Sequence, residues 1–340
     1  MQMEQILEQL LRGESLEFGS ARATLERILS GEVPAAQIAA LAVALRAKGE
    51  TADELAGFAA AMRAAAVRVA APADRPVLDT CGTGGDGTGT FNISTVVAFV
   101  VAAAGVTVAK HGNRSISSRS GSADVLEALG FRIDLPPAAM ERCLAEAGFA
   151  FLFAPALHPA LKVVQPVRRE LKIRTIFNLL GPLANPAGAP YQLIGAPSRE
   201  AAAKMAQALA QLGTRRAYVV HGEDGLDEVS ITGATHAYEV SEDGLRYEKL
   251  TPERFGLTAH PLEALRGGEA AENAAIARRI LEGEAGAPRD VVLANAATAL
   301  VVAEVVRTLR EGVERAAQAI DSGAALAQME KSAALTRTLG

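Results

Sequence analysis

Apolar side chains recur at the three- and four-residue spacing of amphipathic helices through residues 4–67, as between Ile6 and Leu10. Thr51 can cap one of these helices, because Glu54 stands three residues later and completes a capping box. The stretch has no alternating strand pattern. It therefore predicts a small unit made only of helices.

From about residue 75, short apolar runs alternate with helical stretches, which is typical of an α/β domain with a mainly parallel sheet. The expected strands are Val77–Asp79, Val106–Ala109, Ala150–Phe153, Gln192–Gly195, Ala217–His221 and Ala237–Val240. The expected helices are Ser94–Ala104, Ala201–Leu212, Glu272–Leu281 and Val291–Leu309, with another starting near Ser122.

These patterns divide the chain into a helical domain, residues 1–70, and an α/β domain, residues 75–340, whose central sheet is flanked by helices. The segment Pro166–Asn178 is expected to be helical, with the proline in its first turn. We expect residues 163–180 to return to the helical domain, which would make that domain discontinuous.

A glycine-rich loop, Gly82–Gly89, follows the first expected strand and contains five glycines. Such a backbone can approach a ligand closely and form a nest of N–H groups for an anion. The loop leads into a helix start, which is a natural phosphate site. A plain flexible turn is the alternative. A dinucleotide site is disfavoured, because Lys110 stands where that motif needs an acidic residue.

A second loop, Lys110–Ser122, follows the second strand and interleaves three basic residues with five serines. Cations and hydroxyl groups both bind phosphate oxygens. Two such loops at two strand ends predict a ligand with two separated phosphate groups, although a solvated surface loop is the alternative. His111 could face that ligand or serve a structural role.

Composition narrows the choice of function. The chain is 49% hydrophobic and carries a net charge of −5, so neither global disorder nor a broadly basic nucleic-acid surface is expected. Its longest apolar stretch, Val96–Ala109, is too short to cross a bilayer, so we expect no membrane attachment. Two cysteines are too few for a disulfide framework and favour a cytoplasmic protein.

Several long motifs, in this order, resemble the anthranilate phosphoribosyltransferase family over nearly the whole chain. They are Gly82–Asp86, Asn92–Thr95, Lys110–Arg114, Val167–Arg168, Arg174–Leu183, His221–Glu228 and Asn295–Ala297. The resemblance implies a fold similar to nucleoside phosphorylases and a homodimer formed through the helices. It also implies transfer of the phosphoribosyl group of phosphoribosyl pyrophosphate (PRPP) to anthranilate, the second step of tryptophan biosynthesis from chorismate.

The resemblance assigns site residues as well. It implies PRPP contacts from Gly82, Gly85, Asp86, Thr90, Asn92, Ile93, Ser94, Thr95, Lys110, His111, Gly112, Asn113, Arg114, Ser115, Ser117, Ser118 and Ser122. It implies anthranilate contacts from Gly82, Asn113 and Arg168, and two Mg²⁺ ions held by Ser94, Asp227 and Glu228. Without the resemblance, Asp227 and Glu228 would be interpreted as two solvated loop residues. Arg168 would be interpreted as a surface residue, and its neighbour Arg169 would be an equal candidate for the carboxylate of anthranilate.

The chemistry agrees with this assignment. Mg²⁺ prefers hard oxygen ligands and typically combines one or two carboxylates with substrate phosphates. Anthranilate is an aromatic amine that is unprotonated near neutral pH, so no general base and no covalent nucleophile such as Cys81 is required. The alternatives are a pyrimidine nucleoside phosphorylase, whose lysine- and serine-rich signatures are missing, and a non-catalytic nucleic-acid-binding relative, which should be more basic.

Overall fold

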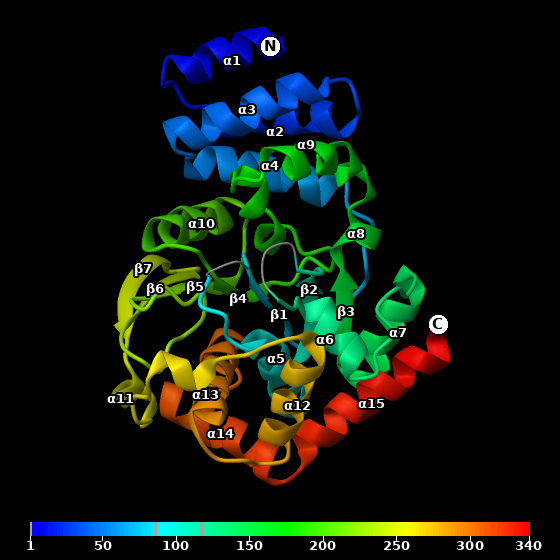
Figure 1. Ribbon diagram of the computed structural model, residues 1–340, viewed down its shortest axis with the longest axis vertical. Coiled ribbons are helices and arrows are strands. Elements are labelled where there is room, and N and C mark those ends of the chain that lie inside the picture. Colours follow the sequence, from blue (N-terminus) through cyan, green and yellow to red (C-terminus); the bar gives the residue numbers. More distant parts are fainter. Residues whose placement is uncertain (1, 85–86, 116–118) are drawn as a thin grey trace.

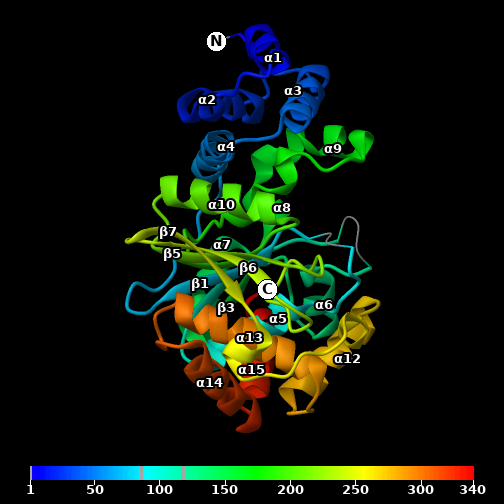
Figure 2. The same cartoon turned by 90° about the vertical axis from the view of Figure 1, so that its left-hand side faces the viewer.

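The computed structural model describes residues 2–84, 87–115 and 119–340 and has a helical bundle stacked on an α/β layer (Figures 1 and 2). Its sheet has seven strands in the order β3-β2-β1-β4-β5-β6-β7. The strands are β1 Val77–Gly82, β2 Thr107–Gly112, β3 Phe149–Phe153, β4 Tyr191–Gly195, β5 Arg216–Gly222, β6 Thr235–Ser241 and β7 Gly244–Leu250. The first five in spatial order are parallel, and β6 and β7 run antiparallel to their neighbours.

The N-terminal bundle confirms the expected all-helical unit. It contains α1 Met3–Leu11, α2 Phe18–Leu29, α3 Ala35–Lys48 and α4 Ala52–Ala64. The capping box of α4 is present: the Thr51 hydroxyl accepts from the Glu54 N–H, and the Glu54 carboxylate accepts from the Thr51 N–H. The same buried carboxylate accepts from the Leu16 N–H and pairs with Lys48, so it also ties the linker before α2 to α4.

Helices cover both faces of the sheet because its side chains alternate. On β4, Leu193 packs among residues of α5 (Ile93–Ala103) and α13 (Ala287–Val302), while Ile194 packs among residues of the bundle and α10 (Arg199–Gln211). The other elements are α6 Ser122–Ala128, α7 Pro137–Ala147, α8 Ala154–Leu157, α9 Gln165–Leu171, α11 Pro252–Phe255, α12 Ala270–Leu281, α14 Leu309–Asp321, α15 Ala324–Leu339 and the 3-10 turns η1 Pro159–Val163, η2 Ile176–Asn178, η3 Gly181–Leu183 and η4 Leu262–Leu265.

The segment around α9 lies against the N-terminal bundle. Val164 and Val167 share a cluster of buried apolar side chains with Leu41 and Leu45 of α3. Helix α9 packs against α3, which is far from it along the chain, and Figure 2 shows the two helices side by side. This packing supports our proposal that residues 163–180 complete a discontinuous helical domain. No helix among the described residues is long and apolar enough to cross a membrane.

Two expected helices are shorter than their patterns suggested. The helix expected over Val291–Leu309 ends at Val302, because Glu304 adopts a left-handed φ of 61° and Thr308 caps a new helix, α14. The helix expected over Pro166–Asn178 likewise ends at Leu171, where Lys172 has a φ of 52°. A left-handed residue cannot continue an α-helix, so both predictions of a single helix were wrong.

Two strand predictions also need correction. β2 continues to Gly112, so Lys110 and His111 belong to the strand and not to the loop, and they pair with Phe151 and Leu152 of β3. β7 was not expected, because most of its side chains are exposed at the sheet edge and show no apolar alternation.

Candidate functional site

The two loops expected to bind anions leave the carboxyl ends of neighbouring parallel strands, β1 and β2. Ligands bind at this edge of open α/β sheets. Asn92 joins the loops directly, since its side-chain amide donates to the Ser120 carbonyl oxygen at 3.2 Å. The side-chain oxygen of Asn92, Oδ1, accepts from the buried Asn273 side-chain amide of α12 at 2.9 Å. One end of the Asn92 amide therefore holds the second loop, and the other end fixes Asn92 to α12.

The glycine-rich loop turns sharply before α5. Gly84, Gly87 and Gly89 all have positive φ, between 65° and 77°. The loop then pairs with the segment before α12, because Thr90 forms an isolated β-bridge with Arg266. Ile93 and Thr95 at the start of α5 are buried, and Ser94 between them is half-buried. The positive end of α5 thus points at the loop, as a phosphate site requires.

Four residues predicted to contact PRPP lie outside the described residues: Gly85, Asp86, Ser117 and Ser118.

Lys110 lies beneath this loop and is 2% exposed. Its ammonium group donates to the Thr80 carbonyl oxygen and, at 3.0 Å, to the Ser94 hydroxyl oxygen. Burial lowers the pKa of Lys110, and the nearby carboxylates of Asp79 and Glu228 oppose that shift. The ammonium group therefore joins β1, β2 and α5 at the helix start.

The predicted metal ligands Asp227 and Glu228 lie in the loop between β5 and β6, which packs onto the ends of β1 and β4. Asp227 Oδ2 accepts from the Gly84 N–H at 3.1 Å. A Cβ atom added to Gly195 would stand 1.6 Å from the Asp227 carbonyl oxygen, and one on Gly82 would stand 3.1 Å from Oδ2. At Gly195 only glycine leaves room for the acidic loop, and at Gly82 a side chain would press on the Asp227 carboxylate.

Asp224 bonds residues that come before and after the acidic pair in this loop. Its carboxylate accepts from the hydroxyl groups of Ser230 and Thr232, each at 2.6 Å, and from the Leu226 N–H at 3.1 Å. Sequence reasoning missed Asp224, because an acidic residue in a glycine-containing turn carries no distinctive signal.

The oxygen donors of this edge suit Mg²⁺. Asp227 and Glu228 contribute carboxylates and Ser94 contributes a hydroxyl group, and hard oxygen ligands of this kind are those that Mg²⁺ prefers. Asp227 packs closely on Gly82 and Gly195, which holds this carboxylate at the carboxyl ends of β1 and β4. The site therefore fits the cation that the sequence predicts.

Asp79, Cys81 and His111 form a second, buried cluster with potential ligand atoms within 4.8 Å of one another. This cluster does not fit Mg²⁺. The Asp79 oxygens already accept from the His111 N–H at 3.0 Å and from the Asn185 amide at 2.7 Å. Burial raises the pKa of the Cys81 thiol well above its ordinary value, which keeps it protonated.

The second loop folds back onto α6. Gly112 and Ser122 are in close contact, and the Ser122 hydroxyl donates to the Asn113 carbonyl oxygen at 3.3 Å. The Ser115 N–H donates to Asp124. Arg114, whose contact with PRPP stays a prediction, pairs with two carboxylates of α6, Asp124 at 2.8 Å and Glu127 at 2.6 Å.

His111 points away from Lys110, because neighbouring residues of a strand face opposite sides of the sheet. Its Nδ1 bonds the Gly181 carbonyl oxygen at 3.0 Å, and its ring lies 5.1 Å from that of His158. Nε2 of each ring is buried without a hydrogen-bond partner among the described residues. Burial lowers the pKa of His111 to about 3 and that of His158 to about 4, so both rings are neutral at pH 7.

Arg168 and Arg169 of α9 differ in their surroundings. Arg168 is half-buried and Arg169 is exposed, and burial together with Arg174 lowers the pKa of Arg168. Arg174 in turn donates to the Gly84 carbonyl oxygen at 2.6 Å. The segment that carries Arg168 therefore reaches the glycine-rich loop, and a partly desolvated guanidinium there suits a carboxylate ligand.

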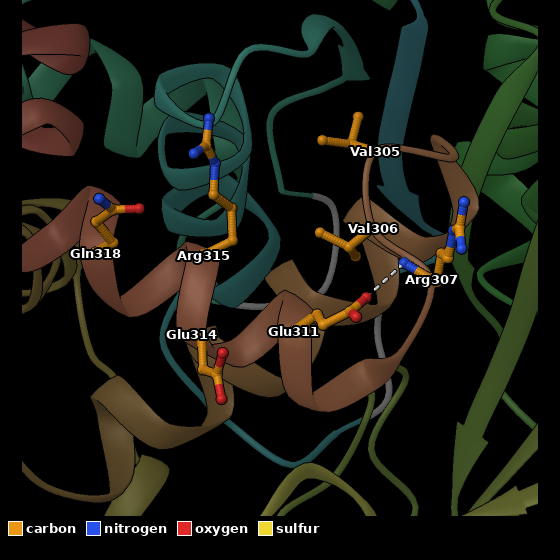
Figure 3. Close-up of a pocket in the computed structure, with 7 residues that line it drawn as sticks. All are labelled: Val305, Val306, Arg307, Glu311, Glu314, Arg315 and Gln318. Atoms are coloured by element: carbon orange, nitrogen blue, oxygen red, sulfur yellow. Dashed lines mark hydrogen bonds between the residues drawn. The ribbon is translucent and has the colours of Figure 1, made fainter.

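A groove elsewhere lies between the Val305–Arg307 turn and α14, where the Arg307 N–H donates to Glu311 (Figure 3). It lies at the opposite edge of the sheet, since the Tyr191 hydroxyl at the start of β4 donates to Glu304 just before this turn. None of the predicted site residues lines it.

The family comparisons agree with this division of the chain. Residues 4–66 match the helical bundle domain of a glycosyl transferase family, and residues 74–326 match the α/β domain of that family.

Individual relatives extend the similarity over the full length. The chain is 53% identical over 337 residues to the anthranilate phosphoribosyltransferase of Thermomicrobium roseum, covering 98% of this chain and 97% of the relative. The crystal structure of the Thermus thermophilus enzyme of that name has a TM-score of 0.92 and 47% identity, covering 97% of this chain and 99% of that one. The Saccharomyces cerevisiae enzyme in complex with PRPP and Mg has a TM-score of 0.91 and 29% identity, covering 99% and 98%.

The buried imidazole of His158 predicts a pH-dependent stability. Its folded-state pKa of about 4 lies below the ordinary value of 6.5, so the unfolded chain binds a proton that the folded chain excludes. This contribution to stability is present above pH 6.5 and is lost as the pH falls towards 4. We expect His158→Asn to reduce the loss of unfolding free energy between pH 7 and pH 4 by about 2–3 kcal/mol.

Urea unfolding of both proteins at several pH values measures this difference, and a comparison at pH 7 and pH 8, above the transition, is the internal control. Parallel stability curves from pH 7 to pH 4 would show that the imidazole is not held neutral.

Proposed function

We propose roles for the site residues from one premise: the chain belongs to the anthranilate phosphoribosyltransferase family. It is a pentosyltransferase that joins the 5-phosphoribosyl group of PRPP to the amino nitrogen of anthranilate and releases pyrophosphate, in tryptophan biosynthesis. The observation that carries this function is the pair of loops at neighbouring strand ends, bridged by Asn92 and Ser120.

The glycine-rich loop and the start of α5 bind the phosphate groups of PRPP in this proposal. Their backbone N–H groups and the α5 dipole attract the anion. Lys110 orients the Ser94 hydroxyl, and Asn92 sets the distance between the two loops. Arg114 takes part through its ion pairs with α6, which shape the second loop, since its guanidinium group is already paired there.

Asp227, Glu228 and Ser94 would hold magnesium, with two ions proposed by resemblance. When bound, the metal supplies positive charge that stabilises the departing pyrophosphate. The chain's own part is to fix the oxygen ligands, and it does so by packing the acidic loop on Gly82 and Gly195. A magnesium complex with PRPP is known for the yeast relative, which supports this role.

Arg168 would grip the carboxylate of anthranilate with two parallel hydrogen bonds, and Gly82 and Asn113 would contact the rest of the molecule. The amine attacks the C1 carbon of the ribose as the bond to pyrophosphate breaks, and the amine proton leaves to solvent. Positioning of the two substrates then supplies much of the rate acceleration.

A PRPP-dependent loss of anthranilate fluorescence tests the reaction directly. With purified protein, PRPP and Mg²⁺, we expect anthranilate to be consumed with matching release of pyrophosphate, and a chelator to stop both. Excess Mg²⁺ should restore the activity after chelation. Turnover that continues unchanged in the presence of chelator would remove the metal from the proposal.

Arg168→Ala should raise the KM for anthranilate by about tenfold or more, because a paired charge on a bound carboxylate is worth about 1.5–3 kcal/mol. The KM for PRPP should change much less. Arg169→Ala is the matched control, since this neighbouring side chain is exposed, and it should leave both constants near those of the unchanged protein. Equal effects of Arg168→Ala on the two substrates would remove its assigned role.

We also propose a cytoplasmic homodimer formed through the helical bundle. Leu11 of α1 and Val43 of α3 are 72% and 42% exposed, and these two helices pack together. Light scattering should give the mass of two chains, and replacing both residues by aspartate should give one. Val305→Asp, at an exposed apolar position before α14, is the control that should stay dimeric. A single-chain mass for the unchanged protein would contradict the dimer.

A further inference from the structure

Asn295 is an unusual residue for its place in the fold. It lies in the middle of α13, whose central turns are almost entirely apolar and buried, and its own side chain is 0% exposed. Burying an amide costs free energy unless its hydrogen bonds are satisfied. Apolar side chains fill the rest of this helix face, so the hydrogen bonds of Asn295 explain its presence better than packing does.

The Asn295 amide bonds both peptide groups of one loop residue, Val229. Its Oδ1 accepts from the Val229 N–H at 2.9 Å, and its Nδ2 donates to the Val229 carbonyl oxygen at 2.8 Å. Nδ2 also donates to the Val291 carbonyl oxygen one turn earlier in α13, which fixes the amide orientation. The Asn295 side chain thus satisfies both backbone hydrogen-bonding groups of Val229, as a neighbouring strand would.

Val229 directly follows Asp227 and Glu228 in the chain. The loop is fixed just before the acidic pair by Asp224, which accepts from the Leu226 N–H, and just after the pair by Asn295, which bonds Val229. Only the two acidic residues stand between these points. The Asn295 bonds therefore limit how far both carboxylates can move.

We propose that Asn295 is a positioning residue for the metal-binding carboxylates, acting through the Val229 backbone. This inference rests on the proposed function, in which Asp227 and Glu228 hold Mg²⁺. Partners in the outer shell of a metal site typically change affinity or activity by about 10–100-fold when they are removed. Loss of the Asn295 bonds should therefore weaken metal binding before it affects the recognition of anthranilate.

A structural role alone would give a different result, and Thr298 provides the comparison. Thr298 is also 0% exposed on α13, but its hydroxyl donates to the Ala294 carbonyl oxygen inside the helix at 2.9 Å. Thr298→Val removes a buried hydrogen bond of the same helix without touching the acidic loop. It reports what a loss of stability alone does to metal binding.

The experiment measures Mn²⁺ binding in the presence of PRPP by electron paramagnetic resonance, which does not depend on turnover. We expect Asn295→Leu, which keeps the number and branching of the side-chain heavy atoms, to raise the Kd for Mn²⁺ about tenfold or more. The Mg²⁺ concentration for half-maximal activity should rise in parallel, and the KM for anthranilate should change little. Asn295→Ala serves if the leucine variant does not fold.

A Kd within about twofold of that of Thr298→Val, in a folded Asn295 variant, would overturn the inference. Asp227→Asn separates this failure from failure of the proposed function. If Asp227→Asn weakens Mn²⁺ binding and the Asn295 variants do not, only the inference is wrong. If neither change affects Mn²⁺ binding, the proposed metal site is wrong as well, and the inference falls with it.

Discussion

The close packing of the Asp227 main chain on Gly195 is the constraint on which the rest of the site depends. A single added carbon atom at Gly195 would overlap the Asp227 carbonyl oxygen. This contact brings the β5–β6 loop over the ends of β1 and β4, so that Asp227 can accept from the Gly84 N–H. The acidic loop and the glycine-rich loop consequently share one edge of the sheet, although 143 residues separate the two partners of this bond.

The sheet divides the site electrostatically, because Lys110 and His111 are neighbours on β2 and face opposite sides. On the α5 side a buried ammonium group supports Ser94 and lies near Glu228. On the other side His111 and His158 are neutral at pH 7, because burial lowers the pKa of each ring. The two imidazoles therefore add no positive charge on that side.

Sequence patterns predicted the elements that depend on interactions between residues close together in the chain. The Thr51 capping box, the buried parallel strands and the position of the glycine-rich loop could all be read from neighbouring residues. β7 could not, because its pattern lacks apolar alternation. The pairing of Arg114 with α6 and the orientation of the His111 ring depend on contacts between distant segments, which spacing does not reveal. Asn295 gave a usable signal, a lone amide in an apolar helix, but its partner could be found only in the structure.

The backbone of Gly84 connects the acidic loop with the segment that follows α9. Its N–H donates to Asp227, and its carbonyl oxygen accepts from Arg174, which follows the helix that carries Arg168. Each of these bonds joins a backbone group to a charged side chain, so each is stronger than a bond between two neutral groups. In the proposed function Asp227 also holds the metal, so the bond from the Gly84 N–H helps to orient that ligand. A side chain at position 84, where φ is 65°, would strain the backbone that makes both of these contacts.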